Sequence, residues 1–530
     1  MDDPLSKLLR RFGITKLRAL AGETIIAAIE KVAPADLEKQ VSQILLLKYG
    51  EAILDQREIR MCIMDVLDES SCLKLCRLIG KPARTHIQGS TILRDYFRTF
   101  SYKKSKQLVD FLGLDTAFYY NKIADLRTDT EAIAITPGEQ INLKNYLHPF
   151  QKSIKDDILE FLVQRGKRFF VQMPTGSGKT YTALEAVVDI LRRRRRKKYV
   201  VWLVDSNELA EQAFDSFAYL WKLKGDRSVY AFRLFHSFNP SFNDTEGGVV
   251  FASFAQFYSI LKNTKHSAYE ALWRLIENSE LLIVDEAHAS VAETYETCIR
   301  CFLNTDYTSV FGLSATPGRS NPDSTKQLIG LYSNNLVRLK DDSGKPIKDP
   351  VGYLQEQSFL AHLDCKILET GITVSDSDEN SLLATLAINS DRNDRILEQI
   401  KLADDAKEST LVFACTLDHV LALFILCKAK GIKAEYIIGA VSQARRLDIL
   451  SRFKNRDFSI LLNLDILSTG IDVPNINKII ITRPIGTPIL YSQILGRALR
   501  GPKNGGNETN TVITIKDNLL NFPSANFIYR

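Results

Sequence analysis

The first 130 residues carry a helical pattern of hydrophobic positions. In residues 5–13, 17–30 and 34–54, apolar side chains recur three and four positions apart, which is the spacing of one face of an amphipathic helix. Gly13 and Gly50 are expected to end helices, and Pro34 is expected to begin one. The pattern therefore predicts an all-α domain over residues 1–130.

From about residue 140 the pattern changes to short apolar runs that alternate with helical segments. Such runs are typical of strands buried on both faces, and their alternation with helices indicates a parallel sheet covered on both sides. Residues 318–385 contain polar loops and have weaker periodicity. The sequence predicts an α/β fold with two parallel-sheet domains, at residues 131–325 and 386–530, joined by a connector at 326–385. The runs are 169–173, 199–204, 248–253, 281–286 and 309–316 in the first block, and 409–415, 434–438, 458–464, 478–484 and 511–515 in the second.

The composition is that of an ordinary globular protein. Of 530 residues, 45% are hydrophobic and 25% are charged, and the formal net charge is +6, which permits a polyanionic partner without demanding one. The acidic start lacks the long apolar core of a secretory signal, and Asp418 and His419 interrupt the apolar stretch at 410–426, so no membrane span is expected. The eight cysteines are sparse, which favours the reducing cytoplasm.

A phosphate-binding loop is predicted where a strand, a glycine-rich turn and a helix meet, at residues 169–180, FFVQMPTGSGKT. Gly176 and Gly178 allow backbone conformations in which amide N–H groups converge on a phosphate, and the start of the following helix adds the positive end of its dipole. In such a loop Lys179 would reach the β- and γ-phosphates of a nucleotide, and Thr180 would bind Mg²⁺. The alternative is an ordinary glycine turn before a helix, because Met173 stands where the strict pattern has glycine.

An acidic pair follows another buried run. Asp285 and Glu286 come directly after the apolar residues 281–284, and ligands of open parallel sheets bind beyond the carboxyl ends of the strands. An aspartate there can hold the Mg²⁺ that the loop needs, and the adjacent glutamate can orient and deprotonate the water that attacks the γ-phosphate. The alternative, a surface Asp-Glu pair in a loop, is disfavoured by the apolar run that precedes the pair and by the loop upstream.

A series of segments in order resembles the motifs of a known enzyme superfamily. They read LHPFQKSI, MPTGSGKT, VDSNELAEQ, VVFASFAQF, DEAH, SAT, LVFACT, LSTGIDVPNI and QILGRALRGP. Together they resemble the superfamily 2 helicases and translocases of the DEAH-box type, in the branch with type I and type III restriction motors and bacterial repair helicases. The resemblance covers residues 145–520, tolerates the departure at Met173, and implies two RecA-like domains that share ATP and Mg²⁺.

The resemblance also implies roles for individual residues. The catalytic groups would be Asp285, Glu286, His288, Gln493, Arg497 and Arg500, with the two arginines as arginine fingers. The nucleotide would contact Gln151, which reads adenine, and Pro174, Thr175, Gly176, Ser177, Gly178, Lys179, Thr180, Gly470 and Asp472, while Thr180 and Asp285 would hold Mg²⁺. Nucleic-acid contacts would come from Ser206, Ser253, Thr416 and Ser468. His148 stands where relatives often carry arginine, so adenine recognition departs from the family pattern.

Two domains that share one nucleotide imply a stepping mechanism. The phosphate loop and Glu286 belong to the first α/β domain, and Arg497 and Arg500 belong to the second. Because these arginines are three residues apart, a helix would present them on one face. Only a closed cleft pairs the guanidinium groups with the γ-phosphate, so ATP would close the cleft and hydrolysis would reopen it. A strand across both domains would be gripped in alternation, mainly through its backbone.

Two basic stretches lie outside these motifs. Residues 192–198, RRRRRKK, are interpreted as a solvated helix end at the sheet edge opposite the nucleotide, in preference to a polyanion-binding patch. Residues 94–106 interleave aromatic residues with Arg94, Arg98, Lys103, Lys104 and Lys106. Either this second stretch contacts phosphates and stacks on bases, or it is an amphipathic helix whose aromatic residues belong to the core.

The sequence therefore predicts a cytoplasmic ATP hydrolase that moves along nucleic acid. DNA is favoured over RNA only through the restriction and repair resemblance, and the same association suggests DNA repair or defence against foreign DNA. The rival hypothesis is an ATP-gated subunit that clamps nucleic acid or a partner protein with little unwinding. The helical domain is the candidate surface for a partner protein. Since the chain ends soon after residue 522, no nuclease domain is expected to follow.

Overall fold

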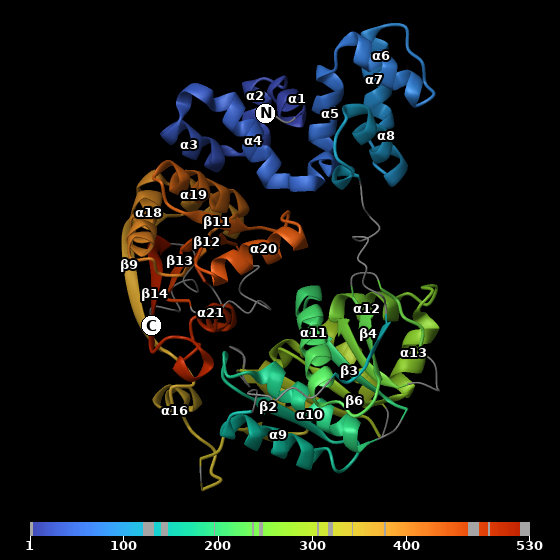
Figure 1. The fold of residues 1–530 in the computed structure, drawn as a ribbon, viewed down its shortest axis with the longest axis vertical. Coiled ribbons are helices and arrows are strands. Elements are labelled where there is room, and N and C mark those ends of the chain that lie inside the picture. The colour runs from blue at the N-terminus through green and yellow to red at the C-terminus, as the bar shows by residue number, and fades with distance from the viewer. Residues whose placement is uncertain are drawn as a thin grey trace.

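The computed structural model describes residues 4–119, 132–138, 147–194, 197–235, 238–242, 247–304, 307–315, 322–341, 343–375, 378–464, 476–485 and 488–519. They form a helical domain, drawn in blue, and two α/β domains, drawn in green and in orange to red (Figure 1). The first α/β domain runs from β1 to α16, and the second runs from β9 to β14. The predicted fold class is confirmed. Within these ranges, no helix is both long enough and apolar enough to cross a membrane.

The helical domain follows the predicted pattern, with one difference. Gly50 lies at the end of a helix, and Pro34 opens the short turn before that helix, as expected. Residues 17–30 look like one helical segment in the sequence, but they belong to two helices. Gly22 between them adopts a backbone φ of 92°, which residues other than glycine rarely adopt. The elements are α1 (Pro4–Arg10), α2 (Ile14–Ala21), α3 (Glu23–Val32), η1 (Pro34–Asp36), α4 (Leu37–Tyr49), η2 (Gly50–Asp55), α5 (Arg57–Val66), α6 (Glu69–Leu78), α7 (His86–Tyr96), α8 (Tyr102–Leu112) and η3 (Thr116–Phe118).

The first α/β domain contains a sheet in the order β1-β4-β5-β3-β6-β7-β2-β8, in which only the β1–β4 pair is antiparallel. Its strands are β1 (Ala132–Ile135), β2 (Arg168–Gln172), β3 (Tyr199–Val204), β4 (Val229–Leu234), β5 (Gly248–Ser253), β6 (Ser279–Val284), β7 (Ser309–Ser314) and β8 (Leu336–Arg338). Alternate side chains enter two separate cores: Phe169 and Val171 join one, and Phe170 joins the other. Both faces are therefore covered, as a mainly parallel sheet requires.

Helices supply the outer layers of both cores. One face of the sheet is covered by α9 (Pro149–Phe161), α10 (Lys179–Arg193) and α11 (Asn207–Lys224). The other face is covered by α12 (Phe254–Lys262), α13 (Tyr269–Glu277), α14 (Glu293–Leu303) and α15 (Pro322–Leu331). Two short elements complete the domain, η4 (Ala287–Ala289) and α16 (Pro350–Glu356).

The second α/β domain contains a fully parallel sheet in the order β11-β12-β10-β13-β14-β9. Its strands are β9 (His362–Val374), β10 (Thr410–Phe413), β11 (Ala434–Ile437), β12 (Ile460–Asn463), β13 (Lys478–Ile481) and β14 (Thr509–Leu519). Its helices are α17 (Glu379–Ile388), α18 (Ser390–Asp405), α19 (Leu417–Ala429), α20 (Gln443–Lys454) and α21 (Pro488–Leu495), with a short η5 (Pro502–Asn504).

The structure divides the predicted connector at 326–385 between the two sheets. Strand β8 adds to the first sheet, and β9 forms the edge of the second. Neither has the continuous apolar run of a buried strand: β8 is three residues long, and most side chains of β9 are exposed. Edge strands of this kind carry a mixed pattern, so hydrophobic periodicity alone misses them.

The helical domain is docked on the second α/β domain. Helix α3 packs along α19, and buried residues of both domains belong to one continuous hydrophobic core. Two ion pairs cross the boundary, Lys31–Asp394 at 2.6 Å and Lys48–Asp418 at 2.8 Å. Figure 1 shows the helical domain seated above α18 and α19. We infer that a motion of the second α/β domain would carry the helical domain with it.

Close approach at this boundary leads to a prediction for Gly50. It has a φ of 54°, and a Cβ added there would lie 2.8 Å from the carbonyl oxygen of Ala440 in the second α/β domain. Gly80 has a φ of 74° with no atom within 4 Å of an added Cβ, so Gly80→Ala controls for a positive φ in open space, where the backbone strain is about 1–2 kcal/mol. We expect Gly50→Ala to lower the urea midpoint clearly more than Gly80→Ala. Equal losses would contradict a tight contact at Ala440.

Candidate nucleotide site and nucleic-acid interface

The predicted phosphate loop has the expected surroundings. It joins β2 to α10, and Gly176 and Gly178 adopt φ values of 79° and 84°. A Cβ at Gly178 would lie 2.6 Å from Nε2 of Gln151, and that amide nitrogen donates to the Ser177 carbonyl oxygen at 2.9 Å. Ser177 also donates its hydroxyl hydrogen to the Pro174 carbonyl oxygen at 2.7 Å. The loop is therefore held from within and by Gln151.

The two predicted magnesium ligands converge. The Thr180 hydroxyl at the start of α10 donates to Oδ2 of Asp285 at 3.0 Å, and Asp285 follows β6 directly. Burial, and then the charge of the adjacent Glu286, raise the pKa of Asp285, while Lys179 and the Thr180 hydrogen bond act in the opposite direction. A hydroxyl and a buried carboxylate at hydrogen-bond distance fit Mg²⁺, because this ion prefers oxygen ligands and usually takes only a few of them from the protein.

Glu286 lies between cations and a histidine. Its Oε1 is 4.0 Å from the Lys179 ammonium, and its Oε2 is 3.3 Å from Nδ1 of His288. Burial alone would raise the pKa of Glu286, but Lys179, the His288 hydrogen bond and the charge of Arg497 hold it well below its usual range. The carboxylate therefore stays ionised, which is the form that can accept a proton. The backbone φ of Glu286 is 50°, which is unusual for a residue other than glycine. Unusual backbone angles of this kind are frequent at functional sites.

His288 connects the acidic pair to the end of β7. Its Nδ1 lies 3.2 Å from the hydroxyl oxygen of Ser314, and both side chains are buried. Ser314 opens the SAT segment, whose third residue, Thr316, lies outside the described residues. Glu286, His288 and the SAT serine thus form one contiguous cluster at the carboxyl edge of the sheet.

The second α/β domain meets the phosphate loop directly. A Cβ at Gly496 would lie 2.0 Å from Cγ2 of Thr175, and a Cβ at Gly176 would lie 3.3 Å from Leu499. The Thr175 and Ser492 hydroxyl oxygens are 3.4 Å apart. Gln493 lies on the same helix as Ser492, α21. The last sequence motif therefore faces the nucleotide loop, and glycine at position 496 is what allows this approach.

One geometric expectation for that motif is wrong. Arg497 and Arg500 were expected on one helical face, but α21 ends at Leu495. Arg497 lies in the turn that follows, and Arg500 pairs in an isolated antiparallel bridge with Leu360. Spacing of three residues places side chains together only inside a helix, and Gly496 is the residue at which this helix gives way to a turn. Arg497 is the arginine whose charge reaches Glu286.

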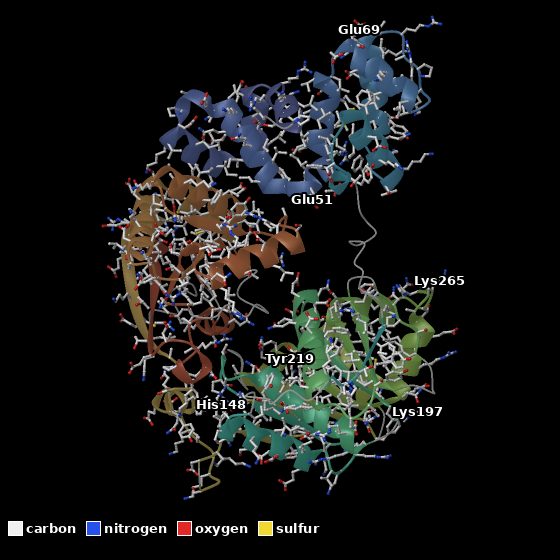
Figure 2. The ribbon with its side chains drawn as sticks, viewed as in Figure 1. Glu51, Glu69, His148, Lys197, Tyr219 and Lys265 are labelled. Atoms are coloured by element: carbon white, nitrogen blue, oxygen red, sulfur yellow. The ribbon has the colours of Figure 1, made fainter. Side chains whose placement is uncertain are left out.

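The segment expected to read adenine lies at the boundary of the domains. Figure 2 labels His148 where the first α/β domain meets the second. The ring centroids of His148 and Phe359 are 4.5 Å apart, and Nε2 of His148 lies 2.8 Å from Oδ1 of Asn504. The backbone N–H of His148 donates to Oε1 of Gln151 at 3.0 Å. Sequence reasoning did not find Asn504, since no motif links positions 356 residues apart.

Three of the four predicted nucleic-acid contacts share a structural role. The hydroxyls of Ser206, Ser253 and Thr416 each accept from a backbone N–H at the start of a helix, at 3.3, 3.4 and 3.1 Å. Ser253 is 1% exposed, so its own hydroxyl does not reach the surface. Helix starts attract phosphate through their free N–H groups, and this is the route by which these segments can meet a backbone. Ser468, Gly470 and Asp472 lie outside the described residues.

In the basic stretch at 192–198, Arg194 and Lys198 contact their own domain, while Arg192, Arg193 and Lys197 are exposed. Helix α10 ends at Arg193, as expected from the sequence. Arg194 hydrogen-bonds the Leu162 carbonyl oxygen and lies 3.5 Å from Glu280. Lys198 donates to the Asn278 side chain at 3.0 Å. These contacts favour a structural role.

The basic stretch at 94–106 divides between core and surface. Phe97 is fully buried, and Lys104 donates to the Thr99 hydroxyl at 2.8 Å while lying 4.5 Å from the centre of the Tyr96 ring. Arg94 pairs with Asp65 at 2.5 Å. Base stacking by Phe97 is therefore excluded, and the core-helix interpretation holds for it. The side chains of Arg98, Tyr102, Lys103 and Lys106 are exposed.

Comparison with known proteins agrees with this geometry. Residues 144–319 match the family model described as type III restriction enzyme, res subunit, and residues 392–502 match the helicase conserved C-terminal domain. The putative ATP-dependent helicase IRC3 of Saccharomyces cerevisiae is 27% identical over 366 residues, which cover 67% of this chain and 49% of that protein. The type I restriction enzyme EcoKI endonuclease subunit of Escherichia coli is 25% identical over 410 residues, 69% of this chain and 34% of that one.

Solved structures show a weaker likeness. Dbp5 of S. cerevisiae bound to RNA and ADP BeF3 gives a TM-score of 0.47 at 17% identity, covering 71% of this chain and 85% of that chain. The alignments with the first curated relatives span about half the length of those proteins, namely 49%, 58% and 55%.

The two family models match this chain in order, one on each of the two parallel-sheet domains that meet at the phosphate loop. The chain belongs to the superfamily 2 helicases.

Proposed function

We propose that this chain is an ATP-dependent nucleic-acid motor, a helicase or translocase of the DEAH type. One observation carries the proposal: the phosphate loop and Glu286 of the first α/β domain face Gly496 and Arg497 of the second. A nucleotide bound at this loop would contact both domains. Its hydrolysis can therefore change how the domains sit against each other.

The roles of the first-domain residues follow from their contacts. Lys179 and the loop amides would bind the β- and γ-phosphates, and Thr180 and Asp285 would hold Mg²⁺. Bound Mg²⁺ would offset the negative charge on those phosphates. Glu286 would orient a water and accept its proton, because its carboxylate is ionised and partly exposed. His288 would hold the Glu286 carboxylate in its orientation, since Nδ1 of His288 lies 3.3 Å from Oε2 of Glu286.

The second-domain residues would complete the site only in the closed cleft. Arg497 would stabilise charge that develops on the γ-phosphate during transfer, as arginine fingers do. Loss of the γ-phosphate removes its partner, and the domains can then separate. The helical domain would move with the second α/β domain, since the two share one core. Domain motion of this kind can step a bound strand.

DNA is the substrate we propose, because the match to restriction enzyme subunits covers the first α/β domain. Measuring ATP turnover with single-stranded DNA, duplex DNA and RNA at saturation tests both parts of the proposal. We expect marked stimulation by DNA, strongest with a single strand. Stimulation by RNA alone would overturn the choice of DNA, and no stimulation by any of the three would overturn the motor.

A further inference from the structure

Three neighbouring strands end together at the carboxyl edge of the first sheet. Strands β3 and β6 are in register with Leu203 opposite Val284, and strands β3 and β5 with Val204 opposite Ser253. Continuing these registers past the strand ends brings Asp205 level with Glu286 on one side and with Phe254 on the other. Asp205 and Phe254 thus flank the helix starts expected to meet a nucleic-acid backbone, and Asp205 also lies beside the catalytic glutamate.

Tyr295 bridges these strand ends from another element. It lies in the first half of α14, nine residues after Glu286. Its ring stacks on Phe254 with centroids 4.0 Å apart and planes 5° from parallel. Its hydroxyl donates to Oδ1 of Asp205. A single side chain downstream of DEAH therefore contacts both segments of the first α/β domain that carry predicted strand contacts.

We propose that Tyr295 is a positioning residue that couples strand binding to ATP hydrolysis, acting through Asp205 and Phe254. This inference rests on the proposed function and assigns a residue to its regulation. Phosphates bound at the starts of α11 and α12 would fix Ser206 and Phe254 in place, and Tyr295 would hold Asp205 in the same arrangement. Asp205 is level with Glu286, so a shift of Asp205 would change the surroundings of the water-activating carboxylate. Burial raises the pKa of Asp205, while the nearby charge of His288 lowers it and that of Glu286 raises it.

Without the hydroxyl, the two strand-binding segments lose the bond that ties Asp205 to the helix following DEAH. Hydrogen bonds to charged groups are among the stronger ones in proteins, and their loss changes an equilibrium about tenfold or more. The ring and its stacking on Phe254 remain in Tyr295→Phe. The defect should therefore lie in coupling and leave the folded domain intact.

The test compares Tyr295→Phe with Tyr307→Phe. Tyr307 is a matched control, because its hydroxyl also donates one hydrogen bond, to the Glu277 carbonyl oxygen, near the opposite edge of the same sheet. For each variant, kcat is measured with and without saturating single-stranded DNA, beside the KM for ATP. We expect Tyr295→Phe to lower the stimulated kcat about tenfold, with basal kcat and KM for ATP within about twofold. Tyr307→Phe should match the wild type.

Two outcomes would overturn the inference. One is an unchanged ratio of stimulated to basal kcat in Tyr295→Phe, and the other is an equal fall of both rates. In a double-mutant cycle, Tyr295→Phe and Asp205→Ala should be strongly non-additive, because the first removes the donor and the second removes the acceptor of the same bond, whereas additive effects would contradict the bridge. These failures differ from failure of the proposed function, which would appear as absent stimulation in the wild type itself.

Discussion

Glu286→Gln is expected to bind ATP with nearly wild-type affinity and to lose about 10²–10⁴-fold in turnover, the range for removal of a general base. The amide keeps the shape of the carboxylate and can still contact His288, which lies 3.3 Å away. It cannot accept a proton from water. The measurement is phosphate release at saturating DNA, with nucleotide affinity from a fluorescent analogue. Glu277→Gln, at an exposed position at the end of α13, controls for the change in charge.

Lys179→Ala separates binding from chemistry. This lysine is buried beside Glu286 and, in the proposed mechanism, supplies the main cation for the β- and γ-phosphates, so ATP affinity should fall about 10- to 100-fold. Glu286→Gln should instead trap the closed, strand-gripping state. Equal loss of nucleotide affinity in both variants would contradict the roles assigned to the two residues.

Arg497→Ala should keep much of the ATP affinity yet lose about a thousandfold or more in DNA-stimulated turnover, as when other arginine fingers are removed. In the proposed mechanism, the first-domain residues bind ATP without Arg497, whereas the charge that develops during phosphoryl transfer is stabilised by Arg497. Arg497→Lys should rescue poorly, because an ammonium cannot make the planar two-pronged contact of a guanidinium. The measurement is steady-state ATP hydrolysis with saturating single-stranded DNA, beside the affinity for a nucleotide analogue.

Two further variants sharpen the arginine test. Arg445→Ala is the control, since Arg445 is exposed on α20 and pairs with Asp448 at 3.1 Å, and surface pairs of this kind contribute little. Arg500→Ala tests whether Arg500, which lies beyond the turn that follows α21, shares the role proposed for Arg497. Near-normal turnover in Arg497→Ala would rule out a site completed by the second α/β domain.

The sequence predicts well those parts whose chemistry is local. The phosphate loop needs a buried strand, two glycines and a helix start within twelve residues, and all of these are visible in one stretch. Asp285 and Glu286 could be placed because they follow a continuous apolar run, and strand ends of a parallel sheet meet at one edge. The contact between Thr180 and Asp285 confirms that two such local signals converge.

The sequence predicts poorly those parts that depend on where a helix ends or on which domains touch. Arg497 and Arg500 satisfy a helical spacing, yet Gly496 against Thr175 marks a tight turn that spacing cannot show. Phe97 alternates with basic residues as a stacking residue would, but tertiary packing buries it. Docking of the helical domain on α19 leaves sequence signals that are easily read in other ways, such as the glycine at position 50, because glycine has many other uses.

A displacement assay separates a moving motor from an ATP-gated clamp. Single-stranded DNA carries biotin at one end or the other with streptavidin bound, and ATP-dependent release is followed for the wild type and for Glu286→Gln. The account predicts that the wild type displaces streptavidin from one end only, and that Glu286→Gln, which binds ATP and DNA but does not hydrolyse, displaces none. DNA-stimulated ATP hydrolysis with no displacement from either end would contradict movement along the strand and would support the clamp.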